Sequence, residues 1–420
     1  MSEPDRIVGE LLQPGGVAAL GELGLINCLE NIDSIPCHGY GVFYNDEVVH
    51  IPYPKTEGGT PHRGRSFHHG RFIMNLRRAV SKVPRRCWPD NPSSTVHPSV
   101  TIYEATANEI IRCPITEHVL GVICSPKDNR ETFRRFFAPL TIVVDGCFSK
   151  FRKDFIPREV QVKSNFVGFV MKDCVLPYKH HGHVVLGKTA PILMYQIGSN
   201  ETRVLIDIPG KLPSNGTGAL KKYIEMEILP AIPKSVQQSF YEAIQRERLR
   251  SMPNSFLPPS TNTTEGLIML GDAMNMRHPL TGGSDTKLIL MKMHTFHWKR
   301  KFNSSTVVNV LAQALYALFA ANVSDTDYLD QNLCVLREAC FEYFKLGGIC
   351  IDHPCGMLAG VFTNPFLLIT HFFAVAALGI WRLFVNGKMV QIPENIVKSF
   401  MVFYTACVVI LPYLWWETKS

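Results

Sequence analysis

Two carboxylates in this sequence each follow a short apolar run and begin a turn. Asp272 ends the run from Gly266, and Asp145 ends a β-branched run from Leu140. Ligands of open α/β sheets are held at the carboxyl ends of strands, so both carboxylates are suited to accept hydrogen bonds from the hydroxyl groups of a cofactor. Taken alone, each pattern is also typical of an ordinary turn.

The residues after each turn could bind negative charge. Ser149 and Arg152 are three positions apart, so on one helix they would present a hydroxyl and a guanidinium to a pyrophosphate or a nicotinamide nucleotide. A capped helix with an exposed arginine is the alternative. After Asp272, Pro279 and the pair Gly282-Gly283 would let a helix start approach an anion. Together the two turns predict a flavin site.

The two turns, in this order and spacing, resemble those of flavoprotein hydroxylases of the aromatic-hydroxylase type. Longer motifs narrow the resemblance to the squalene monooxygenase (squalene epoxidase) family, of the fungal type. It covers nearly the whole chain, and the matching motifs are Asp5–Gly16, Phe67–Met74, Arg250–Ser260, Asn309–Tyr316 and Tyr343–Gly348.

The resemblance implies an FAD-dependent monooxygenase that converts squalene to (S)-2,3-oxidosqualene in sterol (ergosterol) biosynthesis. It implies dioxygen as co-substrate and electrons from NADPH through an NADPH–cytochrome reductase. The expected location is the endoplasmic reticulum membrane, with the catalytic part facing the cytosol and membrane lipid as a further partner. Squalene offers nothing to hydrogen-bond, so an apolar tunnel must place it by shape and by burial worth about 0.8 kcal/mol per CH₂.

The resemblance also implies site residues. Tyr40 is expected near the flavin in a positioning role, with a hydrogen bond to Gln13 that shapes the pocket. The implied cofactor contacts are Arg6, Leu11, Arg71, Val100, Asp145, Asp272, Gly282 and Gly283. The implied pocket residues, for each of which plain helix packing is the alternative, are Phe319, Phe341, Phe344, Pro354, Met357 and His371.

Two departures from the family pattern concern FAD. The printed chain opens without the strand and Gly-x-Gly-x-x-Gly turn that hold the FAD pyrophosphate, and its glycines 15–24 read as part of an amphipathic helix. After Gly283, the segment Ser284–Lys301 resembles a later part of the family joined early. An alternative function is therefore a catalytically impaired, membrane-anchored remnant that does not hold FAD. A geranylgeranyl-reductase-like flavoenzyme is a third option, although it should lack the stretches at 257–260 and 343–348.

Composition agrees with this interpretation. The chain has 420 residues, 46% of them hydrophobic, which is enough for a large core or two domains. Its net charge of +7 is dispersed, so it favours an anionic membrane surface over nucleic acid, and we expect no nucleic-acid partner. Its twelve cysteines form no Cys-x-x-Cys pair, so we expect free thiols and no metal. We expect His180, His181 and His183 to lie in a solvated loop.

The fold class expected around these residues is α/β (α+β). A Rossmann-like FAD domain, truncated at its N-terminus, is predicted over 1–160, with a return at 259–300. An antiparallel substrate sheet with one wet and one dry face is predicted over 161–258. Helices are predicted at 8–23, 72–80 and 221–229, and strands at 40–44, 48–53, 100–104, 119–124, 166–170, 184–186, 192–197 and 203–208.

A helical membrane region is predicted over 301–420. Segments 366–381 and 400–416 contain no Asp, Glu, Lys or Arg. Each is slightly shorter than the about 20 apolar residues of a membrane crossing, which favours an inserted hairpin over two crossings. Trp381, Trp415 and Trp416 suit an interfacial belt, and buried core helices are the alternative.

Overall fold

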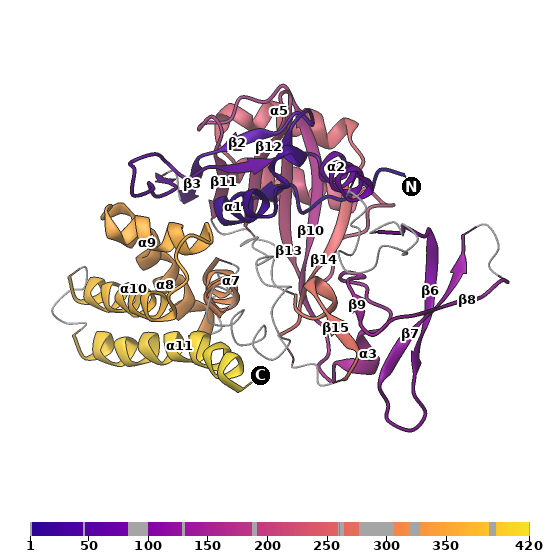
Figure 1. The fold of residues 1–420 in the computed structure, drawn as a ribbon. Helices are drawn as coiled ribbons and strands as arrows, with labels where there is room; N and C mark the ends of the chain where they lie inside the picture. The colour runs from indigo at the N-terminus through magenta and orange to yellow at the C-terminus, as the bar shows by residue number, and fades with distance from the viewer. Residues whose placement is uncertain are drawn as a thin grey trace.

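A seven-stranded sheet separates a helical region from two smaller sheets (Figure 1). This computed structural model describes residues 2–44, 47–82, 100–127, 131–186, 191–258, 260, 264–276, 306–319, 328–385 and 392–419. Within the large sheet, β11 and β3 are parallel and the other neighbours are antiparallel. In spatial order its strands are β14 (Arg250–Phe256), β10 (Gln161–Lys172), β13 (Glu201–Pro209), β12 (Ile192–Gly198), β11 (Gly182–Leu186), β3 (Gly39–Tyr44) and β4 (Glu47–Pro52).

The predicted antiparallel strands are confirmed, but the sheet is larger than predicted. It includes β3 and β4, which come from the range assigned to the FAD domain; the division into domains stays a prediction. The predicted wet face is wrong for β13, where residues 202–208 are all buried. Helix α5 (Lys234–Arg246) and the bent helix formed by α4 (Ala219–Tyr223), η2 (Ile224–Ile228) and η3 (Leu229–Ala231) cover one face. On the other face, Val8 and Leu11 pack against a cluster that includes Leu205.

The N-terminal elements form a small three-stranded sheet and two helices. The sheet has the order β1 (Leu11–Leu12), β5 (Gly64–Ser66), β2 (Ile35–Cys37). The predicted helix 8–23 begins only at Pro14, because residues 11–12 pair with β5 and proline is well suited to a first helical position. The helices are α1 (Pro14–Glu22), the short η1 (Ile26–Leu29) and α2 (His69–Ser81), which confirms the helix predicted at 72–80.

A three-stranded meander contains β6 (Ala105–Arg112), β7 (Val119–Pro126) and β8 (Arg134–Phe137). The strand predicted at 100–104 is wrong, and the strand begins at Ala105 instead. Ala105 pairs with Pro126, where β7 ends, so the preceding residues have no partner strand there. Beside the meander, β9 (Thr141–Val143) and β15 (Leu267–Met269) form a parallel pair, followed respectively by α3 (Arg152–Phe155) and η4 (Gly271–Ala273).

The C-terminal third is helical. Helices α10 and α11 contain candidate membrane spans of 21 and 24 residues, which at about 1.5 Å per residue exceed the roughly 30 Å hydrocarbon core. The expectation that these segments are too short to cross is therefore wrong, because the helices extend beyond the uncharged runs. Only 28% of the most apolar stretch of each is buried. The helices are α7 (Thr306–Phe319), α8 (Tyr328–Lys345), α9 (Ile349–Leu358), α10 (Pro365–Val385) and α11 (Ile392–Lys419).

Candidate functional site

The structure brings the two carboxylate turns together. Strands β9 and β15 are parallel and in register, with Val143 opposite Met269, so Asp145 and Asp272 follow neighbouring strand ends at one edge. Both aspartates are exposed at this edge. The backbone N–H of Lys150 donates to Asp145 Oδ2 over 3.0 Å and orients that carboxylate.

Arg152 joins the two turns from below. Its side chain is 7% exposed and donates to four carbonyl oxygens, those of Gly146, Cys147, Asp272 and Ala273, over 2.7 to 3.1 Å. The prediction that Arg152 presents its guanidinium to a ligand is therefore wrong, because these carbonyls occupy it. The shared helical face with Ser149 is wrong too, since α3 begins only at Arg152.

The surroundings of the turns fit a hydroxylated and phosphorylated cofactor such as FAD. Ser149 Oγ is buried and has no hydrogen-bond partner among the described residues, so a ligand oxygen could satisfy it. The exposed Arg6 guanidinium lies 3.9 Å from where a Cβ on Gly146 would stand. The edge thus combines acceptors for hydroxyl groups with a donor and a cation for phosphate oxygens.

The other predicted cofactor contacts lie on separate elements. Arg71 is in the first turn of α2, where its Nη1 donates to the carbonyl of Ile32 over 3.5 Å. Leu11 packs between the large sheet and the helical region, and Val100 is 46% exposed ahead of β6. Gly282, Gly283 and the helix start predicted after them lie outside the described residues.

Gln13 and Tyr40 are in contact. Gln13 Nε2 donates a hydrogen bond to Tyr40 Oη. On its other side, Gln13 Oε1 accepts from Tyr53 Oη over 2.5 Å, and the Tyr40 and Tyr53 rings meet edge to face at 5.8 Å. Burial raises the pKa of both phenols well above the usual value, so they stay protonated at neutral pH. Sequence reasoning missed Tyr53, which shows no periodicity and follows β4 in a proline-flanked Ile-Pro-Tyr-Pro run.

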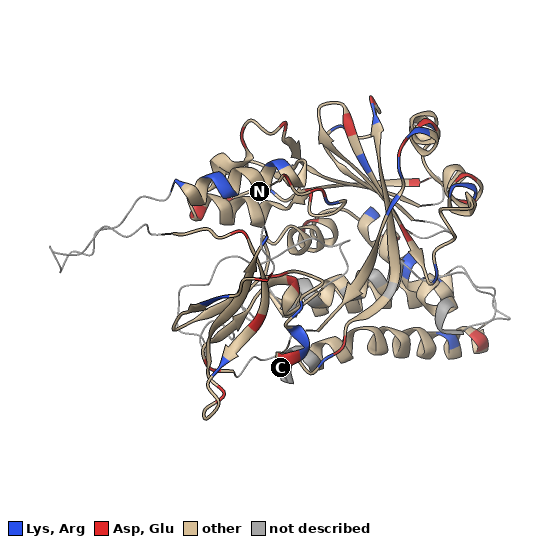
Figure 2. Cartoon of the chain, turned by 90° about the vertical axis from the view of Figure 1, so that its right-hand side faces the viewer, with Lys and Arg blue, Asp and Glu red and all other residues tan. Residues whose placement is uncertain are grey.

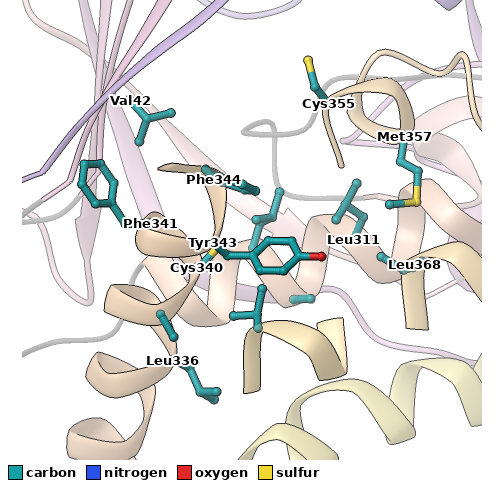
Figure 3. Packing of buried hydrophobic residues seen from close by; sticks show 14 of the residues in the cluster. Val42, Leu311, Leu336, Cys340, Phe341, Tyr343, Phe344, Cys355, Met357 and Leu368 are labelled. Atoms are coloured by element: carbon teal, nitrogen blue, oxygen red, sulfur yellow. The ribbon is translucent and has the colours of Figure 1, made fainter. Parts of the chain in front are cut away.

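Three of the six predicted pocket residues, Phe341, Phe344 and Met357, belong to the apolar cluster between the large sheet and the C-terminal helices (Figure 3). Phe341, Phe344 and Met357 are at most 8% exposed, and Pro354 is buried inside α9. Phe319 ends α7, and the placement of its side chain is outside the description. Their role in holding substrate stays a prediction.

His371 adds a polar chain to this cluster. It is 6% exposed on α10, and its two ring nitrogens face Tyr343 Oη at 2.8 Å and His353 Nδ1 at 2.9 Å. Helices α8, α9 and α10 are therefore tied by hydrogen bonds as well as by apolar contact.

Comparison with solved structures defines the class. The fold matches the flavin-dependent brominase Bmp2 with a TM-score of 0.56 and 11% identity, over 90% of both chains. It also matches a flavoprotein/dehydrogenase from Cytophaga hutchinsonii with a TM-score of 0.57 and 13% identity, over 92% of both chains. At these identities the matches show the fold alone, that of flavoproteins such as these two, which confirms the predicted fold class.

Sequence comparison gives the family. The squalene epoxidase family model matches residues 137–286 and 284–397. The squalene epoxidase erg1 of Aspergillus fumigatus is 46% identical over 99% of this chain and 86% of its own length, and that of Schizosaccharomyces pombe is 42% identical over 100% and 92%. Squalene monooxygenase of Mus musculus is 42% identical over 100% of this chain and 73% of its own length. The chain belongs to the squalene epoxidase family, as its motifs predict.

Proposed function

We propose that this protein is a squalene monooxygenase that converts squalene to (S)-2,3-oxidosqualene in sterol biosynthesis. The observation that carries the proposal is the side-by-side placement of Asp145 and Asp272 in a chain of this family. Each has the position that the family resemblance predicts for a cofactor contact.

The chain's own residues would hold FAD at the edge of β9 and β15. Asp145 and Asp272 would accept hydrogen bonds from cofactor hydroxyl groups, while Ser149 and Arg6 would face phosphate oxygens. FAD, when bound, supplies the dioxygen chemistry, and NADPH supplies the electrons through a reductase. Arg71, Leu11, Val100, Gly282 and Gly283 complete the proposed cofactor contacts.

The apolar cluster would place the hydrocarbon. Phe341, Phe344 and Met357 provide a wall that excludes water and offers no hydrogen bond, which matches the chemistry of squalene. Each CH₂ group buried there contributes about 0.8 kcal/mol, so a long chain can bind tightly without polar contacts.

We further propose that α10 and α11 attach the protein to the endoplasmic reticulum membrane, with the catalytic part in the cytosol beside an NADPH–cytochrome reductase. Trp381, Phe400 and Trp415 are 65%, 73% and 58% exposed on these helices, as expected for side chains that meet lipid. Figure 2 shows the long C-terminal helix with coloured, charged residues mainly near its ends.

Purified protein in detergent, supplied with FAD, NADPH, the reductase and squalene, tests the proposal. We expect oxidosqualene in the lipid extract and a flavin absorbance band that survives gel filtration. Asp272→Asn should weaken flavin retention, whereas Asp154→Asn on neighbouring α3 should not. A parent protein that retains no flavin and forms no product would support the alternative, an impaired membrane-anchored remnant.

A further inference from the structure

We propose that Tyr53 is a positioning residue that holds Tyr40 through Gln13, in a hydrogen-bonded network of the three side chains. The network lies beside the apolar cluster. Tyr53 is buried in that cluster, and Tyr40 packs against it. This inference rests on the proposed function, because it assigns Tyr53 a part in that same site.

Three successive parts of the N-terminal region supply the network. Gln13 precedes α1, Tyr40 lies on β3, and Tyr53 follows β4. Gln13 and Tyr53 are 7% and 2% exposed. Gln13 occupies the N-cap position of α1 but makes no side-chain capping bond, so its amide is committed to the two phenols.

Donor and acceptor counting shows how Tyr53 acts on Tyr40. Tyr53 donates to Gln13 Oε1, which turns the amide nitrogen toward Tyr40. Tyr40 Oη accepts from that nitrogen and keeps its own proton, and the Tyr40 and Tyr53 rings meet edge to face at 5.8 Å. Gln13 therefore bridges the two phenols, and the proton of Tyr53 fixes the orientation of its amide.

Packing holds the two rings in this geometry. Gly182 lies opposite Tyr40 on β11, where a Cβ would come within 2.9 Å of the Tyr40 ring, so only glycine leaves room for it. The backbone N–H of Tyr53 donates to the carbonyl of His38 over 2.8 Å. The hydroxyl of Tyr53 is thereby presented to Gln13 from a fixed backbone.

The network matters because the side chains around it are apolar. Each polar atom in it has a partner, so none is left to face a hydrocarbon. Without the Tyr53 hydroxyl, nothing holds the Gln13 amide in this orientation, and a turned amide presents its oxygen instead of its nitrogen to Tyr40. The substrate's double bond would then be placed less accurately. This would lower the rate of the reaction more than it would weaken the binding of the hydrocarbon.

Four variants test the network: Tyr53→Phe, Gln13→Ala, their combination, and Tyr241→Phe, at a site 45% exposed on α5, as a control. Tyr53→Phe removes the phenol oxygen and keeps the aromatic ring. We expect it to lower kcat about 3- to 10-fold, the effect of one hydrogen bond, with KM changed less than twofold. Gln13→Ala should have a similar effect, the double variant should be no slower than the slower single variant, and Tyr241→Phe should match the parent.

Thermal unfolding of the same four proteins gives a readout that does not need activity. Because Gln13 and Tyr53 share one hydrogen-bonded network, the shifts in unfolding midpoint that their substitutions cause should be less than additive. A kcat of Tyr53→Phe within twofold of the parent, or losses that multiply in the double variant, would overturn the proposal. If the parent turns over no squalene, the proposed function fails. Additive midpoint shifts would then overturn the proposed network separately.

Discussion

At the scale of single residues, Arg152 replaces a ligand contact with a structural one. Its four hydrogen bonds to backbone carbonyls hold the Asp145 and Asp272 turns at one spacing. Arg152→Lys keeps the charge but cannot reach four acceptors, because an ammonium lacks the planar fork of a guanidinium. We expect a loss of about 2–4 kcal/mol in unfolding free energy and weaker flavin retention, measured by urea denaturation and flavin absorbance. Arg134→Lys, on exposed β8, is the control, and equal effects of the two would contradict the clamp.

His183 gives the protein a pH dependence. The solvated loop predicted for it is wrong, because it lies on β11 and is 1% exposed. Burial lowers its pKa from 6.5 to about 4, while its Nε2 accepts the Tyr178 N–H at 3.0 Å. Because the folded-state pKa is depressed, this stability is present above pH 6.5 and is lost as the pH falls toward 4. Between pH 7 and pH 5 we expect the parent to lose about 2 kcal/mol through this group. His183→Gln keeps an acceptor for Tyr178 and should flatten the urea-unfolding profile over this range; an unchanged slope would contradict the assignment.

At the scale of elements, the sequence predicts what local patterns encode. Alternating apolar residues locate β12 and β13, and the runs ending at Asp145 and Asp272 locate β9 and β15. The burial of both faces of β13 could not be predicted, because Val8 and Leu11, which cover it, come from the distant N-terminus. The role of Arg152 was missed for a similar reason: two of its acceptors, the carbonyls of Asp272 and Ala273, lie 120 and 121 residues away.

The exposed face of α11 predicts membrane attachment. Phe400 and Phe403 are 73% and 50% exposed, and Phe403 meets the Phe373 ring of α10 at 5.8 Å, so replacing both with Asp should lower the unfolding free energy by only about 1–2 kcal/mol. In lipid, each buried Phe contributes about 2–3 kcal/mol, so flotation with phosphatidylcholine–phosphatidylserine vesicles should show a large loss of bound protein. Ile115→Asp, at a site 89% exposed between β6 and β7, is the control. Undiminished flotation of the double variant would place the attachment elsewhere.

At the scale of the whole molecule, the N-terminal helix α1 meets the C-terminal helical region beside the proposed site. The backbone N–H of Gly15, in the first turn of α1, donates to the carbonyl of Ala359 at the end of α9 over 2.9 Å. The contact is close because Gly15 has no side chain: a Cβ there would stand 2.8 Å from the carbonyl oxygen of Gly360. Gln13 is two residues from Gly15, so this contact holds the hydrogen-bonded network next to the helical region.

Two identical substitutions in one helix test this coupling. Gly15→Ala should push α1 away from α9, lower the unfolding free energy by about 1–3 kcal/mol, and reduce squalene turnover through Gln13. Gly21→Ala, in the same helix, meets nothing within 4 Å and should be neutral or stabilising by about 0.5–1 kcal/mol, because alanine favours helix. Urea denaturation and steady-state turnover of the two variants check this. Equal effects would show that α1 and α9 are not coupled. Changes in unfolding free energy of opposite sign would show that the contact between α1 and α9 helps to shape the site.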